Sequence, residues 1–212
     1  IGQAFAFACA EQGANVVVAD MNGGDDTVEA IQQKGGQATF VQTDVASEAS
    51  VHAMAAHALK TYGRIDGLVD IVGMARWESI LDMTDETFDW EIDICLRHAF
   101  LLSQAFGRLM SKSGGGTMVF IASVSGFTAA PMHAAYGAAK AGLMAWVQTL
   151  AIELGGFGIR ANAVAPGTIL SPRMEAVFND EQRALNAGNA PLQKMGATAD
   201  IASAALFFSS AM

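Results

Sequence analysis

Short apolar runs alternate with helical segments in the first third of the chain, and this alternation constrains the fold more than any other feature. The apolar runs cover residues 15–20, 37–43 and 65–72, and each helical pattern between them ends at a glycine. Strands that are apolar on both faces are typical of a parallel sheet with helices on each side. The order of the segments therefore predicts an α/β fold with a doubly wound parallel sheet, in a three-layer αβα arrangement.

The later segments extend the same pattern. The further elements that we expect are helices over 2–12, 47–62, 86–112, 133–154 and 200–209, a helix ending near residue 34, and strands over 117–122 and 159–165. Residues 168–196 show loop and helix character without a strand signal. No repeat or linker divides the sequence, so we expect one domain over 1–212, in which 168–196 forms a lid over a substrate.

The charge balance excludes several classes of partner. The chain has 12 Lys and Arg against 21 Asp and Glu, a formal net charge of −9, and its basic residues are scattered. Nucleic acid and membrane surfaces are therefore not expected as partners. No apolar run approaches the ~20 residues of a membrane span, so we expect a cytoplasmic protein. Cys9 and Cys95 lie far apart and in no metal-ligand spacing, so neither a disulfide nor a metal site is expected.

One stretch carries the residue types of a proton-transfer site. Ser123 follows a β-rich run, Tyr136 comes thirteen residues later, and Lys140 comes four residues after Tyr136. Residues four apart lie on one face of a helix, one turn apart. An ammonium beside a phenol favours the phenolate, so we expect Lys140 to lower the pKa of Tyr136 from its usual value near ~10. Such a pair is suited to general acid/base chemistry on an alcohol or a carbonyl.

These residues occur in an order that resembles the short-chain dehydrogenase/reductase family, NAD(P)-dependent oxidoreductases built on one Rossmann-like domain. The matching positions are Asp20, Asp44-Val45, Gly73, Ser123, Tyr136-x-x-x-Lys140 and Pro166-Gly167-x-Ile169-x-Ser171. The resemblance implies that Tyr136 is the general acid/base and that Ser123 hydrogen-bonds the substrate oxygen. It also implies that Lys140 both lowers the pKa of Tyr136 and holds the nicotinamide ribose.

The resemblance also implies a set of cofactor-binding residues. They are Gly2, Asp20, Asp44, Val45, Gly73, Tyr136, Lys140, Pro166, Gly167, Ile169 and Ser171. Asp20 ends the second strand of the family's pattern, where a carboxylate accepts hydrogen bonds from both adenosine ribose hydroxyls and repels a 2′-phosphate. NAD is therefore expected as the cofactor in preference to NADP.

The two ends of the chain depart from the family's pattern. Ile1-Gly2 matches only the end of the glycine-rich phosphate loop, and no strand precedes it. The family's last strand is missing as well. We therefore expect the core of a longer chain, with an interior position of the sheet empty and Val16–Val18 uncovered on one face.

Two departures lie inside the chain. The family's Asn-Asn-Ala-Gly is replaced by Asp70-Ile71-Val72-Gly73, so the asparagines that brace the sheet are absent. Cys95 takes the place of an asparagine that links a water to the lysine in a proton relay. A thiol is a weak hydrogen-bond donor, so this relay is in doubt, and Cys95 is expected as a packed helix residue.

Several apolar and histidine side chains have two possible roles. His98 is expected to be structural, whereas His133 lies near enough to Tyr136 in sequence to reach a substrate. A larger set either lines a hydrophobic substrate pocket or packs in the core. This set consists of Trp77, Phe127, Met132, Met174 and Phe178.

The sequence thus predicts an NAD-dependent oxidoreductase that interconverts a secondary alcohol and a ketone on a mainly apolar small molecule. One alternative is a 3-oxoacyl-thioester reductase, although the net charge of −9 disfavours docking of an acidic carrier protein. Another is a binding or scaffold protein that has lost turnover, as Cys95 and Asp70 suggest.

We also expect a homodimer or homotetramer, because the family commonly pairs the helix over 86–112 and the helix after Tyr136. The apolar stripes on these helices are wide enough to serve both core and partner. They comprise Phe100, Leu102, Phe106, Leu143, Trp146 and Leu150.

Overall fold

The computed structural model describes residues 1–210 as alternating helices and parallel strands. The helices are α1 (Gly2–Glu11), α2 (Asp25–Gln33), α3 (Glu48–Tyr62), α4 (Asp85–Ile92), α5 (His98–Met110), α6 (Ala134–Gly155), α7 (Pro172–Val177), α8 (Asp180–Gly188) and α9 (Thr198–Ser209), with a π-helical segment over Asp93–Arg97 and a 3₁₀ turn over Val124–Gly126. The strands are β1 (Val16–Asp20), β2 (Ala38–Gln42), β3 (Gly67–Asp70), β4 (Gly116–Ile121), β5 (Ile159–Val164), β6 (Ile169–Leu170) and β7 (Gly196–Ala197).

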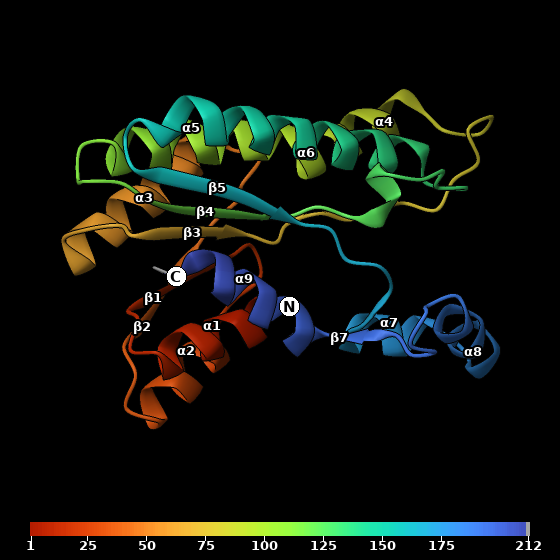
Figure 1. The fold of residues 1–212 in the computed structure, drawn as a ribbon, viewed down its shortest axis with the longest axis horizontal. Helices are drawn as coiled ribbons and strands as arrows, with labels where there is room; N and C mark the ends of the chain where they lie inside the picture. Colours follow the sequence, from red (N-terminus) through yellow and green to blue (C-terminus); the bar gives the residue numbers. More distant parts are fainter. Residues whose placement is uncertain (211–212) are drawn as a thin grey trace.

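Parallel strands form the middle layer, which confirms the predicted fold class (Figure 1). Strand β1 pairs with β2, with Val16 opposite Ala38. Strands β3, β4 and β5 pair in that order, with Gly67 opposite Thr117 and Gly116 opposite Ile159. Helices α3, α5 and α6 lie above the three-stranded sheet in Figure 1, and α9 lies below it beside α1 and α2. All carboxyl ends of β3, β4 and β5 therefore point to one edge.

The core lies between the three-stranded sheet and the helices above it. Strand β4 is buried on both faces, since Met118, Val119 and Phe120 are each 0% exposed. Helix α6 presents Leu143 and Val147 to this cluster at a four-residue spacing. This helix is 22 residues long. Even so, within residues 1–210 no helix has the length and apolar character that a membrane span requires.

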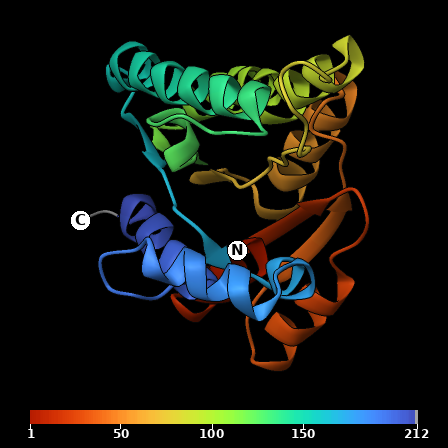
Figure 2. The same ribbon diagram turned by 90° about the vertical axis from the view of Figure 1, so that its right-hand side faces the viewer.

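The two larger sheets are separate in the described part of the chain. A cavity of about 1140 Å³ lies between them, lined by Val16–Val18 of β1 and by Leu68 and Val69 of β3. Figure 2 shows the two layers on either side of this region. As expected from the sequence, one face of Val16–Val18 is thus uncovered by a neighbouring strand.

Two expectations about secondary structure are wrong. The single helix predicted over 86–112 is divided by the π-helical segment Asp93–Arg97, through which the apolar pattern continues without interruption. The region 168–196, predicted without strands, contains β6, which pairs with β7 at the end of the region. Strands of two residues have no detectable alternation of apolar and polar residues, so the sequence gives no signal for them.

Helix α6 offers a direct comparison of buried and exposed positions. Leu143 is 0% exposed and Ile152 is 82% exposed on the same helix. We expect Leu143→Ala to lower the free energy of unfolding by about 2–5 kcal/mol, because it removes buried methyl groups and leaves a cavity. The control Ile152→Ala should change it by less than about 0.5 kcal/mol. Chemical denaturation measures both, and equal losses would contradict the placement of this helix.

Candidate active site

Ser123 is held where strand β4 ends. Its side chain caps the 3₁₀ turn Val124–Gly126 and accepts the Ser125 N–H at 3.2 Å. The next residue, Val124, donates its N–H to the Pro166 carbonyl at 3.0 Å, which ties this turn to the segment after β5. The turn packs closely against α6 at Gly126. Ser123 is therefore fixed by two strand ends and a helix.

Tyr136 and Lys140 come from the first two turns of α6, as the four-residue spacing predicts. Lys140 is 2% exposed, and its Nζ donates to the carbonyls of Ile121 at 2.7 Å and Val72 at 3.3 Å. Nζ lies 5.8 Å from the centroid of the Tyr136 ring. The Tyr136 hydroxyl shares a side-chain hydrogen bond with Ser123. The structure thus brings the three predicted catalytic residues together.

The electrostatics of the pair differ from the expectation. Burial raises the pKa of Tyr136 above its ordinary value, and the hydrogen bond with Ser123 only partly opposes this. Burial lowers the pKa of Lys140, while the neighbouring Cys95 and Asp70 act to raise it. The predicted lowering of the Tyr136 pKa is therefore wrong for the chain alone. The physical reason is that removing the phenol from water disfavours the phenolate.

Cys95 lies in the π-helical segment and is 0% exposed. Its Sγ donates to the Met74 carbonyl at 3.4 Å. Burial raises the pKa of the thiol, which therefore remains protonated at neutral pH. This agrees with the expectation of a packed helix residue. A thiol bonded to a backbone carbonyl does not provide the two-ended contact that an amide gives to a relay water.

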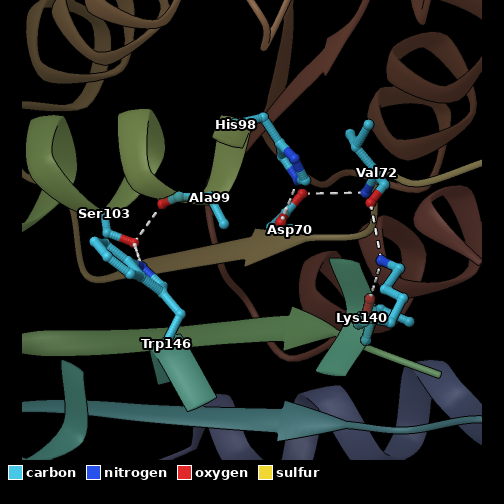
Figure 3. A network of polar contacts seen from close by, with 8 residues as sticks. Asp70, Val72, His98, Ala99, Ser103, Lys140 and Trp146 are labelled. Carbon is cyan, nitrogen blue, oxygen red and sulfur yellow. Dashed lines mark hydrogen bonds and ion pairs between the residues drawn. The ribbon is translucent and has the colours of Figure 1, made fainter. Parts of the chain in front are cut away.

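A buried hydrogen-bonded pair behind Lys140, formed by Asp70 and His98, was missed by the sequence reasoning (Figure 3). His98 Nε2 lies 2.8 Å from Asp70 Oδ2, and the two side chains are 0% and 1% exposed. Asp70 Oδ1 accepts the Val72 N–H at 3.1 Å. The sequence lacks the asparagines that brace the sheet after β3 in the family's pattern. In the structure, Asp70 and His98 form hydrogen bonds at this position instead. The only sequence signals of this pair are an acid that ends an apolar strand and a histidine within an apolar helix.

Aromatic side chains continue outward from Tyr136. The ring of His133 lies 6.0 Å from that of Tyr136 and 4.5 Å from that of Trp77, measured between centroids. Trp77 is 63% exposed and Phe127 is 72% exposed, so neither belongs to the core. The Glu78 N–H donates to the Met132 carbonyl at 2.8 Å and joins the two loops that carry these rings.

The remaining members of the predicted pocket set lie in the expected lid segment. Met174 belongs to α7, Phe178 follows it, and both are partly buried. Helix α7 begins at Ser171, whose hydroxyl accepts the Met174 N–H at 3.3 Å. In Figure 1, α7 and α8 lie on the opposite side of the three-stranded sheet from α4, α5 and α6.

The predicted cofactor residues lie at the carboxyl ends of the strands. Asp20 ends β1 and lines the same cavity as Gly2 at the start of α1. Asp44 and Val45 follow β2, and the Asp44 Oδ1 accepts the Ala46 N–H at 2.9 Å. This edge of a parallel sheet is where open α/β folds bind ligands.

Gly73 and the segment after β5 complete this set. At Gly73, with φ 158°, an added Cβ would lie 2.7 Å from Lys140 Nζ, so only glycine leaves room there. Pro166, Gly167 and Ile169 follow β5, and the Pro166 carbonyl faces the serine turn. Lys140 uses two of its three N–H donors on backbone carbonyls among the described residues, which leaves the third for a ribose hydroxyl. The residues present therefore fit a dinucleotide.

Neither the side chains nor their spacing suggest metal chemistry. Within residues 1–210, no group of three or more His, Cys, Asp or Glu side chains is arranged to hold a metal ion. His57 instead bonds the Thr39 hydroxyl at 3.0 Å, and His52 lies near Glu48 on the surface of α3.

The whole chain matches known enzymes. A family model described as enoyl-(acyl carrier protein) reductase matches residues 1–212. The 7α-hydroxysteroid dehydrogenase of Escherichia coli (strain K12) is 34% identical over 212 residues, which cover 99% of this chain and 83% of that protein. The L-rhamnose 1-dehydrogenase (NAD(P)(+)) of Azotobacter vinelandii is 35% identical over 221 residues, which cover 100% of this chain and 86% of that protein.

Solved structures agree with these relatives. A 7α-hydroxysteroid dehydrogenase complexed with NADH and 7-oxo glycochenodeoxycholic acid has a TM-score of 0.94 and 33% sequence identity. The match covers 99% of this chain and 82% of that one. The arrangement of helices and parallel strands described above is therefore shared along almost the whole chain.

The close approach of Gly126 to α6 gives a test of the site geometry. In Gly126→Ala the added methyl would lie 2.6 Å from Met144 Cε and 2.8 Å from the Ala141 backbone nitrogen, so the serine turn must move. We expect the free energy of unfolding to fall by about 1–3 kcal/mol. We also expect Tyr136 to titrate at higher pH, because the hydrogen bond with Ser123 lowers its pKa and would be lost.

Phenolate absorbance during a pH titration and denaturant unfolding measure these two effects. The matched control is Gly155→Ala on the same helix, where an added methyl meets no atom within 4 Å. It should leave the Tyr136 titration unchanged. An unchanged titration in Gly126→Ala would contradict the contact between the serine turn and α6.

Proposed function

Because the chain belongs to the short-chain dehydrogenase/reductase family and is an NAD(P)-dependent oxidoreductase acting on CH–OH groups, we propose that it interconverts a secondary alcohol and a ketone on a mainly apolar substrate. The observation that carries this proposal is the meeting of Ser123, Tyr136 and Lys140 at the ends of β3 and β4. We propose NAD as the preferred cofactor.

The three side chains have separate roles in this proposal. Tyr136 takes the hydroxyl proton of the alcohol during oxidation and returns a proton to the carbonyl oxygen during reduction. Ser123 accepts the Ser125 N–H through its oxygen, and its hydroxyl proton, which is shared with Tyr136 in the chain alone, would turn to the substrate oxygen when substrate binds. Lys140 holds a ribose hydroxyl with its third N–H. The bound nicotinamide accepts or supplies the hydride that accompanies these proton transfers.

The two directions of the proposed reaction need different protonation states of Tyr136. In the chain alone, burial raises the pKa of Tyr136, so the protonated form predominates at neutral pH. That form is the proton donor needed for ketone reduction. Alcohol oxidation needs the phenolate and should therefore be favoured as the pH rises.

The cofactor would be held by residues at the carboxyl edge of the sheet. We propose that Asp20 bonds the adenosine ribose, that Asp44 and Val45 contact the adenine, and that Gly2 approaches the phosphates. Gly73 lies beside the nicotinamide ribose, next to Lys140. In the same proposal the nicotinamide amide is held by the segment Pro166, Gly167, Ile169 and Ser171.

An apolar substrate is supported by the side chains around Tyr136. Trp77, Phe127 and Met132 are 63%, 72% and 46% exposed on the loops that follow β3 and β4. The ring of Trp77 is linked to that of Tyr136 through His133, and exposed apolar groups near a catalytic residue are typical of a ligand pocket. We propose that residues 168–196, which contain α7 and α8, form the lid of this pocket within a single domain.

We also propose a homodimer or homotetramer. Its contact surface would use fewer side chains than the apolar stripes predicted from the sequence. Leu102, Phe106, Leu143 and Leu150 belong to the core, at 2%, 4%, 0% and 7% exposed. Phe100 is 38% exposed and lies edge-to-face with Trp146, with ring centroids 6.0 Å apart. Of the six side chains in the predicted stripes, Phe100 on α5 and Trp146 on α6 are the two that could contact a second copy of the chain.

Replacement of the proposed acid/base tests the function. Tyr136→Phe should lower kcat for a panel of alicyclic and aryl alcohols by roughly 10²–10⁴-fold, because it removes the proton-transfer group. NAD affinity, measured by tryptophan fluorescence, should stay close to wild type. Tyr62→Phe is the matched control, since Tyr62 is the only other tyrosine and lies at the end of α3. Equal rates in wild type and Tyr136→Phe would refute the proposal. A wild type that binds NAD without turnover would favour a scaffold role.

Cofactor preference tests Asp20. Asp20→Ser removes the charge that repels a 2′-phosphate, so the ratio of kcat/KM with NAD to that with NADP should fall by at least about tenfold. Glu29→Gln, an exposed change of the same charge on α2, is the control and should keep the ratio. An unchanged ratio in Asp20→Ser would refute the assignment of Asp20 to the adenosine ribose.

A further inference from the structure

We infer that Asp70 and His98 are positioning residues for Lys140, and that the buried Asp70 carboxylate helps to hold the Lys140 ammonium in its charged form and in its place. The inference rests on the proposed role of Lys140 at the nicotinamide ribose. Its basis is a continuous chain of hydrogen bonds that runs from α5 through the end of β3 to α6 (Figure 3).

The pair itself is fully enclosed. His98 Nε2 and Asp70 Oδ2 are 2.8 Å apart, with 0% and 1% of the side chains exposed. His98 Nδ1 is buried and has no partner among residues 1–210. The imidazole is therefore oriented by Asp70 alone, with its proton on Nε2 donated to the carboxylate. A buried carboxylate bonded in this way cannot change direction without losing a partner.

The second carboxylate oxygen connects the pair to the site. Asp70 Oδ1 accepts the Val72 N–H at 3.1 Å, which fixes the turn after β3. The carbonyl of the same residue accepts Lys140 Nζ at 3.3 Å. Gly73 follows directly and lies so close to Nζ that an added Cβ would be 2.7 Å from it. The orientation of the Asp70 carboxylate thus helps to fix the Val72 carbonyl and the adjacent Gly73, which both lie beside the Lys140 ammonium.

The charge of Asp70 acts on Lys140 as well. Burial lowers the pKa of Lys140, and Cys95 and Asp70 are the two groups that oppose this. Cys95 is a buried thiol whose own pKa is raised, so at neutral pH it carries no charge. Tyr136, on the same helix as Lys140, is likewise protonated. Asp70 therefore supports the ammonium by its charge, as well as by holding the Val72 residue whose carbonyl accepts Nζ.

Three variants and one control distinguish a positioning role from a loss of stability alone. Asp70→Asn keeps an acceptor for the Val72 N–H and removes the charge. His98→Gln offers an amide donor to the carboxylate, whereas His98→Ala offers none. Ser103→Ala is the structural control, because Ser103 is also buried on α5 and bonds Ala99 and Trp146 without contact to Lys140.

The first readout does not depend on turnover. NMR titration of protein with ¹³C-labelled lysine, with Lys140 assigned from Lys140→Arg, follows the ammonium directly. We expect Lys140 to lose its proton at lower pH in Asp70→Asn than in wild type, because the anion that raises its pKa is gone. Ser103→Ala should show the wild-type titration even where its thermal midpoint falls.

The second readout is steady-state kinetics with NAD. His98→Ala should lower kcat by at least about tenfold, equivalent to ~1.4 kcal/mol, and His98→Gln should recover most of it. This comparison stays decisive if Asp70→Asn does not fold. Wild-type behaviour of both the lysine titration and kcat in Asp70→Asn and His98→Ala would overturn the inference. A wild type without turnover would instead refute the proposed function, and the titration would still test the pairing.

Discussion

The arrangement of the site depends on one constraint, the burial of the Lys140 ammonium. A cation that is 2% exposed must replace its hydration with fixed acceptors, and the structure supplies the carbonyls of Val72 and Ile121. The Ile121 carbonyl ends β4, and the Val72 carbonyl lies in the turn after β3, which pairs in parallel with β4 and is held by Asp70. Because Tyr136 is one turn from Lys140 on α6, satisfying the lysine also places the phenol beside Ser123.

Two residues near Lys140 differ from the family's sequence pattern. A solved relative shares the fold, with a TM-score of 0.94, whereas the amides of the family's sequence pattern are replaced in this chain by Asp70 and Cys95. The structure shows that both replacements are buried, Asp70 in a hydrogen bond with His98 and Cys95 against the Met74 carbonyl. At the end of β3 a neutral asparagine of the family's pattern is thus replaced by the carboxylate of Asp70, which lies behind Lys140.

The sequence predicted those features that leave a local or periodic signal. Strands buried on both faces appear as continuous apolar runs, and glycines mark the helix ends, so most elements were located to within a few residues. Helical spacing placed Tyr136 and Lys140 on one face, and the resemblance to the family added Ser123. The raised pKa of Tyr136 could not be predicted, because it depends on burial rather than on spacing. The Asp70–His98 pair joins residues 28 positions apart, and no periodic pattern connects them.

The π-helical segment Asp93–Arg97 determines the positions of both Cys95 and His98. A π turn contains one residue more than the α turn that it replaces, so it has the effect of a one-residue insertion in a helix. Cys95 lies within this turn and His98 directly after it. The identity of the side chain that faces Asp70 is therefore a matter of helix register. A one-residue deletion here would present a neighbour of His98 to the carboxylate, so length in this segment is as much a determinant of the site as residue type.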